Sequence, residues 1–118
     1  MIIRREQLEA FEGAAQETFR LEVAGYLRKH LPDHTATSSD KELDAKILRW
    51  QARAAQHGVV TERAIAKWCF LSLATNDEFD TLPEIREYLA QPEPEPSVKV
   101  STLMDALYVR LRQAESGA

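Results

Sequence analysis

Two histidines stand four residues apart, a spacing that binds metal when both side chains lie on one helix. His30 and His34 have this spacing, but Pro32 lies between them. Proline in a helix interior removes a backbone hydrogen bond and clashes with the preceding turn, so the helix that the pair requires is broken. No second acidic or thiol cluster lies near the pair in the sequence. The sequence therefore predicts no metal site and no cofactor.

The single cysteine is the other candidate for chemistry. Cys69 would need one of the histidines as its base, but it lies in the uncharged run "WCFLSLA", where a cysteine is typically a small buried hydrophobe. A glycine-rich phosphate loop, a G-x-S-x-G motif and a carboxylate pair in a fixed helical frame are all missing from the sequence. We therefore expect that the protein is not an enzyme.

Acidic residues are concentrated in one segment of a chain whose formal net charge is −4. Arg86 alone opposes seven acids between residues 76 and 97: Asp77, Glu78, Asp80, Glu84, Glu87, Glu93 and Glu95. Such a field repels nucleic acid and steers a basic protein surface, although a solvated acidic loop gives the same pattern.

An aromatic residue lies at the centre of the acidic cluster. Phe79 is flanked by Asp77, Glu78 and Asp80, which is the arrangement of an aromatic anchor surrounded by steering charges. We predict that these four residues form part of a partner-binding site. The alternative is that Phe79 folds back into the core, as buried phenylalanines commonly do.

The chain also contains a helix, tight turn, helix pattern around Gly58 that resembles a DNA reader. A recognition helix needs several cationic or amide side chains for phosphates and base edges, whereas "TERAIAKW" supplies only Arg63 and Lys67 in an acidic protein. We interpret the turn as a short corner between two helices and expect no nucleic-acid partner.

Helical periodicity accounts for nearly the whole chain. Apolar residues recur in steps of three and four from Leu8 to His30, and Pro32 ends this first helix. Ser39 and Glu42 have the spacing of a capping box, which starts a second helix that extends to Gly58.

Two further helices follow before residue 91. Thr61 is a suitable N-cap for the third helix, and Val60 has the position from which a hydrophobic staple reaches Ile65. Thr81 and Glu84 form a second capping-box pattern for a fourth helix that runs to about residue 90. The sequence thus predicts an all-α fold, with a compact bundle of four helices over residues 1–90.

A proline and glutamate linker separates this bundle from a fifth helix. The run "QPEPEP" favours an extended backbone over residues 91–97, and the C-terminal helix and tail occupy residues 98–118. A narrow apolar seam repeats along that helix: Val100, Met104, Leu107 and Leu111. We predict an intermolecular contact through this seam, most simply a homodimer. The alternatives are the chain's own core and a groove on a foreign partner.

The third helix is apolar on more than one face. Ile65, Trp68 and Leu73 share one side, which leaves Phe70 and Leu71 on the opposite side. Either other helices of the same chain cover these two side chains, or they belong to a groove for a partner.

Several features bear on the compartment. One cysteine cannot form an intramolecular disulfide, and no apolar run approaches the roughly 20 residues that a membrane span requires. The first residues do not have the basic-then-apolar pattern of a signal peptide. We expect a soluble, cytoplasmic protein without a membrane partner.

Four segments carry a resemblance to a known group of proteins. They are "REQLEAFEGAAQETF", "YLRKHLPDH", "ILRWQARAAQHGVVTERAIAKWCFLSLA" and "NDEFD", within about residues 3–90. In this order they resemble a group of small helical proteins encoded beside spike, adaptor and toxin genes of bacterial type VI secretion. The chain departs from the group's Gly-x-x-Phe-Asp pattern by Asn76 at the glycine position. It also has Glu84 and Ile85 where a Pro-Trp pair is common.

The resemblance implies a non-catalytic accessory protein that binds other proteins of the secretion system. It would act as an adaptor or co-chaperone for a secreted effector, or for the adaptor that loads this effector on the spike. An immunity protein that neutralises a cognate toxin is the alternative, and a free-standing interaction or regulatory domain is a third. The acidic segment suits an inhibitor of a nuclease, because charge complementarity speeds association with a basic surface.

Overall fold

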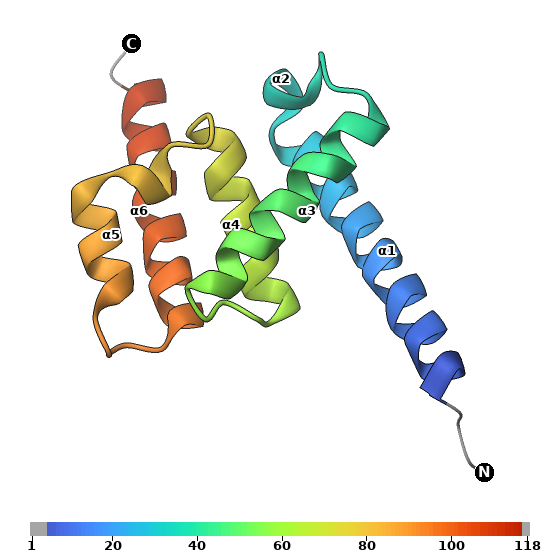
Figure 1. The fold of residues 1–118 in the computed structure, drawn as a ribbon. Coiled ribbons are helices and arrows are strands. Elements are labelled where there is room, and N and C mark those ends of the chain that lie inside the picture. The colour runs from blue at the N-terminus through green and yellow to red at the C-terminus, as the bar shows by residue number, and fades with distance from the viewer. Residues whose placement is uncertain (1–4, 117–118) are drawn as a thin grey trace. The chain divides into compact units, whose positions relative to one another are not determined.

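The computed structural model describes the backbone of residues 5–116 and the side chains of residues 16–110. Throughout this backbone the chain is all-α and has no strand, as the periodicity predicts (Figure 1). The predicted five helices are present, together with a one-turn helix that begins at Pro32 and a 3₁₀ turn before the fourth predicted helix. The elements are α1 (Arg5–His30), α2 (Pro32–Thr35), α3 (Asp40–Gln56), α4 (Glu62–Ala74), η1 (Phe79–Thr81), α5 (Pro83–Ala90) and α6 (Pro96–Ser116).

The chain divides into two compact units at a point within α3. The first unit comprises Met1–Leu48 and the second Arg49–Ala118. The sequence instead predicted a boundary at the linker after residue 90. The difference arises because α6 packs against α4 and α5 and so belongs to the same unit as these helices.

Polar contacts hold the connection between α1 and α3 in the first unit. The Arg28 guanidinium donates to the carbonyls of Thr35 and Ser38 at 3.1 and 2.9 Å, and to the Asp40 carboxylate at 2.9 Å. One arginine thus binds both the end of α2 and the start of α3.

Of the predicted capping box at the start of α3, the bond to the Ser39 side chain is confirmed. The Glu42 amide donates to the Ser39 hydroxyl at 3.1 Å, and that hydroxyl lies 3.1 Å from the Glu42 carboxylate. The bond to the hydroxyl satisfies an amide that has no acceptor inside the helix. Local sequence therefore fixes where this helix begins.

A glycine turn joins α3 to α4 in the second unit. Gly58 has a φ of 77°, a left-handed conformation that glycine adopts without steric cost. Thr61 caps α4 as predicted, because its hydroxyl accepts from the Ala64 amide at 3.3 Å. The predicted staple from Val60 is wrong: Val60 is 71% exposed, and Val59, one residue earlier, is buried instead.

The second predicted capping box, at the start of α5, is also wrong. Thr81 lies in η1 and donates to the Glu78 carbonyl at 2.7 Å. Leu82 is the N-cap residue of α5, and Pro83 occupies the first turn. Proline suits that position because its missing N–H has no intrahelical acceptor there, so the helix starts one residue later than the threonine pattern indicates.

The fifth predicted helix, α6, lies against its own chain. Pro96 in its first turn is so close to the α3–α4 turn that a Cβ added to Gly58 would lie 3.2 Å from the proline ring. Further along, the Lys67 ammonium of α4 donates to the Ser101 hydroxyl of α6 at 2.8 Å. The two helices therefore run in the same direction, side by side (Figure 1). The prediction that the linker holds α6 away from the other helices is wrong.

A buried lysine joins α6 to the end of α5. Lys99 is only 3% exposed, and its ammonium donates to the carbonyls of Leu89, at 3.2 Å, and Gln91. These carbonyls belong to the end of α5, where intrahelical donors are lacking. A cation at a helix C-terminus also interacts favourably with the helix dipole. Lys99 therefore stabilises the turn that leads from α5 into the linker.

Candidate functional site

The predicted partner site centres on the turn that follows α4. Asn76 and Asp77 have φ values of 53° and 69°, in the left-handed region. The Asp77 amide donates to the Ser72 carbonyl at 2.6 Å, and the Thr75 hydroxyl accepts from the Phe79 amide at 3.1 Å. These bonds lie where α4 ends and η1 begins, and the two elements are only a few residues apart. The turn is therefore tightly constrained by its own backbone.

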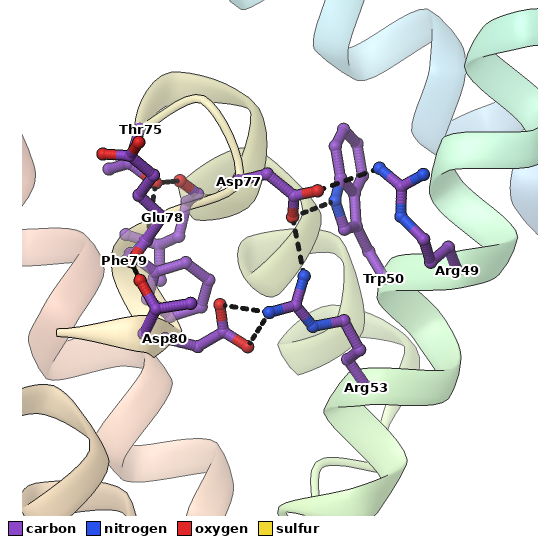
Figure 2. Close-up of polar contacts among 10 residues, drawn as sticks. Arg49, Trp50, Arg53, Thr75, Asp77, Glu78, Phe79 and Asp80 are labelled. Atoms are coloured by element: carbon purple, nitrogen blue, oxygen red, sulfur yellow. Dashed lines mark hydrogen bonds and ion pairs between the residues drawn. The ribbon is translucent and has the colours of Figure 1, made fainter.

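Two of the predicted site carboxylates are hydrogen-bonded inside the protein (Figure 2). Asp77 accepts from Arg49 at 2.9 Å, from the Trp50 indole at 2.8 Å and from Arg53 at 2.9 Å. Nη2 of Arg53 lies 2.8 and 2.7 Å from the two carboxylate oxygens of Asp80. The Asp80 side chain is only 7% exposed. These two carboxylates attach the turn to α3 and are not free to steer a partner.

The two arginines in this network were not recognised from the sequence. Arg49 and Arg53 are four residues apart, so they lie on the same side of α3. This spacing marks a cationic patch, but the carboxylates that they contact lie 24 to 28 residues further along the chain. No local pattern specifies such a distant pairing.

The aromatic residue of the predicted site lies in the core. Phe79 is 2% exposed, and its ring contacts Trp68 edge to face with the ring centroids 4.8 Å apart. Trp68 also stacks with His57, and their ring centroids are 5.3 Å apart. The prediction that Phe79 is an exposed anchor is wrong, and the alternative that it folds back into the core is confirmed. The reason is that η1 turns the ring toward α4, where burial stabilises it.

The two apolar residues on the far side of α4 are also buried. Phe70 and Leu71 are 2% and 3% exposed. The Phe70 ring lies 5.6 Å from that of Tyr108 on α6. Helices of the same chain therefore cover this face, so the prediction of a partner groove at these two residues is wrong. α4 is apolar on several sides because elements of its own unit surround it.

The predicted seam of α6 faces its own unit. Val100 and Met104 are 0% and 5% exposed, and Leu107 is partly buried. The side chain of Leu111 lies outside the described residues. For Val100 and Met104, the prediction of an intermolecular contact is wrong because α4 and α5 occupy the space beside α6.

The other acids of the segment remain exposed and without a cation partner among the described residues. Glu78 lies in the turn, and the rest follow it on α5 and in the linker: Glu84, Glu87, Glu93 and Glu95. We call these last four residues the α5–linker acids. Arg86 is the one cation between them, and residues 91–95 are all exposed. Of the predicted site residues, Glu78 is thus the one that is both charged and freely exposed.

The residues that suggested chemistry from the sequence lie apart from this surface. His30 ends α1, where its ring is 4.6 Å from that of Tyr26, and His34 lies in α2. Within the part of the chain that the structure describes, no three His, Cys, Asp or Glu side chains could hold a metal ion. Cys69 is fully buried, and burial raises the pKa of its thiol to about 12. The thiol therefore stays protonated at neutral pH.

Comparisons with known proteins found no family model, no curated protein and no solved structure that matches this chain. Over residues 5–116, no helix combines the length and apolar character that crossing a membrane requires.

Proposed function

We propose that this chain is a non-catalytic, protein-binding accessory factor, an adaptor or co-chaperone for a type VI secretion effector or for the adaptor that loads this effector. The resemblance over about residues 3–90 supports the secretion context. The observation that supports protein binding is the charge that remains after internal pairing. The α5–linker acids have no cation partner among the described residues, whereas Asp77 and Asp80 are bound by arginines of α3.

The unpaired charge is concentrated within twelve residues of sequence. Residues 84–95 hold four carboxylates against Arg86. Exposed charges of one sign raise association rates with a surface of the opposite sign, and they do so most at low salt. We therefore propose a basic surface on the protein partner and place the contact on α5 and the linker.

The backbone of the linker supports the same proposal. Pro92, Pro94 and Pro96 alternate with glutamates, and each proline restricts its own φ angle. A restricted segment loses less conformational entropy when it binds than a flexible one does. Lys99 also fixes the start of the linker through its bond to the Gln91 carbonyl. The carboxylates of Glu93 and Glu95 are thus carried on a segment with limited freedom.

An immunity protein remains the second candidate, and the same charges favour it. The substrate cleft of an enzyme that cleaves nucleic acid is basic, and an acidic segment can occupy such a cleft. Cell survival separates the two roles. An immunity protein restores growth when it is co-expressed with its active toxin, whereas an adaptor binds the effector or its loader and leaves the toxin active.

The test is co-purification with the products of neighbouring genes, followed by a charge-removal variant. In the test variant the exposed acids Glu87, Glu93 and Glu95 become glutamine. We expect the dissociation constant for the captured partner to rise about tenfold at low ionic strength, and less at high salt. Glu84 is left unchanged because it lies in the first turn of α5, where a negative charge favours the helix.

A matched control removes two exposed acids from the first unit. It carries Glu17→Gln and Glu22→Gln, and it is compared with a linker variant of equal net charge that carries Glu93→Gln and Glu95→Gln. If both variants weaken binding equally, general charge rather than the α5–linker acids attracts the partner. If neither weakens it, the proposed contact surface is wrong.

A further inference from the structure

A groove lies between the parallel helices α4 and α6, within the second unit. Its volume is about 610 Å³. The side chains that line it include Thr61, Arg63, Lys67, Val98, Ser101 and Asp105. The α5–linker acids are not among the lining residues, so this groove is distinct from the surface proposed above.

The groove presents mainly hydrogen-bond donors. The Thr61 hydroxyl accepts from the Ala64 amide and the Ser101 hydroxyl accepts from Lys67, so both hydroxyl hydrogens remain for another acceptor. The Lys67 ammonium uses one of its three hydrogens for Ser101. Arg63 adds the five N–H groups of its guanidinium. A ligand that satisfies these donors must be rich in acceptor oxygens.

The charges of the lining residues favour an anion. Arg63 is exposed and forms no ion pair with any described residue, and Lys67 is bound to a hydroxyl and not to a carboxylate. Asp105 is the single carboxylate of the lining. Two cations against one anion leave a net positive groove on a protein whose formal net charge is −4. Arginine binds carboxylates in a bidentate manner, which adds geometric specificity to the attraction.

The shape of the groove suits a chain segment better than an enclosed small molecule. Five of its lining residues are exposed, so the groove is open to solvent: Thr61, Arg63, Val98, Thr102 and Asp105. Val98 is 46% exposed and provides an apolar surface beside the charges. An open groove with an apolar wall and cationic side chains can accept a peptide, whose carboxylates bind while its carbon atoms contact the wall.

We propose that the α4–α6 groove binds an acidic peptide segment of a protein partner, with Arg63 and Lys67 binding its carboxylates. This goes beyond the function proposed above, because it adds a second contact of opposite charge. A partner that touches both surfaces would have to carry both a basic and an acidic region. Two contact surfaces of opposite charge disfavour a partner whose surface carries charges of only one sign.

The experiment uses two short synthetic peptides and the full chain. One peptide carries alternating Asp and Glu residues separated by alanine, and the second replaces each acid by Asn or Gln. Both have blocked termini, so that only side-chain carboxylates differ. We expect the acidic peptide to bind at least about tenfold more tightly than its amide counterpart at low ionic strength. Amide chemical shifts should change at Arg63, Lys67 and Ser101.

Variants of single residues locate the contact. Arg63→Gln should weaken binding of the acidic peptide about fivefold, whereas Arg86→Gln, which removes an exposed arginine from α5, should leave it unchanged. Asp105→Asn should strengthen binding about twofold, because it removes the one carboxylate of the groove. A gain in affinity cannot result from partial unfolding, so this variant protects the test against loss of structure.

Three results would overturn the proposal. They are equal affinity for the two peptides, an Arg63→Gln variant that binds like wild type, and complete displacement of the peptide by inorganic phosphate at a similar concentration. The last result would indicate a site for small anions and not for a peptide. None of these results bears on the α5–linker acids, since the peptide probe contains no basic residue. The experiment therefore distinguishes a failure of the groove proposal from a failure of the proposed function.

Discussion

In the turn after α4, the carboxylates of Asp77 and Asp80 accept hydrogen bonds from arginines of α3, whereas the acids on α5 and in the linker accept none from any described cation. Both groups belong to one acidic stretch of the sequence, residues 77–95. The difference is that Arg49 and Arg53 of α3 donate hydrogen bonds to the first group only. A run of acids therefore has no single role that composition alone decides.

The two groups also differ in the free energy that is needed to keep their carboxylates charged in the folded protein. Asp80 is buried, and a buried carboxylate is unfavourable unless a cation and hydrogen bonds compensate for the lost hydration. The exposed Glu87, Glu93 and Glu95 keep their hydration and need no partner for stability. We infer that the first group contributes to folding and that the second is available for binding.

The largest expected effect concerns the aromatic residue between the paired carboxylates. Phe79→Ala leaves a void beside Trp68, and we expect it to lower the free energy of unfolding by about 3–4 kcal/mol. Urea denaturation measures this change. The exposed neighbour gives the control, since Glu78→Gln should shift the free energy by less than about 0.5 kcal/mol. An unchanged free energy of unfolding in Phe79→Ala would contradict the buried position of this ring.

The second prediction compares the two arginines of α3. Arg53→Gln leaves Asp80 buried without a cation, and we expect a loss of about 2–3 kcal/mol in the free energy of unfolding. Arg49 is 56% exposed and binds only Asp77, which keeps two other donors, so Arg49→Gln should cost less than about 1 kcal/mol. Equal losses would show that the burial of Asp80 does not decide the energetics.

The helix starts show how far sequence reasoning reaches. The caps that Thr61 and Ser39 form depend on residues within one turn, and both were predicted correctly. Thr81 has the same local signal, yet Pro83 moves the start of α5 by one residue. The sequence thus contains both local signals. The prediction placed the helix start by the threonine, whereas the proline decides it.

The candidate site was harder to predict because its contacts are distant in sequence. The approach of Pro96 to Gly58 and the bond from Lys67 to Ser101 place α6 on its own chain. A linker of alternating prolines gives no sign of this, because it is compatible with either a free or a docked helix. The same holds for Arg53 and Asp80, which are 27 residues apart. Charge was predictable from composition, but the pairing of charges was not.

The third prediction separates backbone conformation from side-chain bonding within the turn. Asn76 and Asp77 both have positive φ values, which glycine adopts at lower steric cost. Asn76 is exposed, so Asn76→Gly should raise the free energy of unfolding by about 0.5 kcal/mol.

Asp77→Gly is the matched variant, because it relieves the same backbone conformation but removes a carboxylate that accepts three hydrogen bonds. We expect it to lower the free energy of unfolding by about 2 kcal/mol. Urea denaturation of both variants shows whether each one raises or lowers the free energy of unfolding. A gain in stability for Asp77→Gly would mean that the network with α3 contributes less than the strain of the turn.

The smallest expected effect on stability is at the α5–linker acids. Replacing Glu87, Glu93 and Glu95 by glutamine removes three charges that no described cation binds, so no ion pair is lost. We expect the free energy of unfolding to change by less than about 0.5 kcal/mol, with a slight gain at low salt from reduced repulsion. Urea denaturation at low and high salt measures this change, and the Arg53→Gln variant provides the contrast. A loss above about 1 kcal/mol would show that these carboxylates are paired in solution, and the division between folding and binding charges would fail.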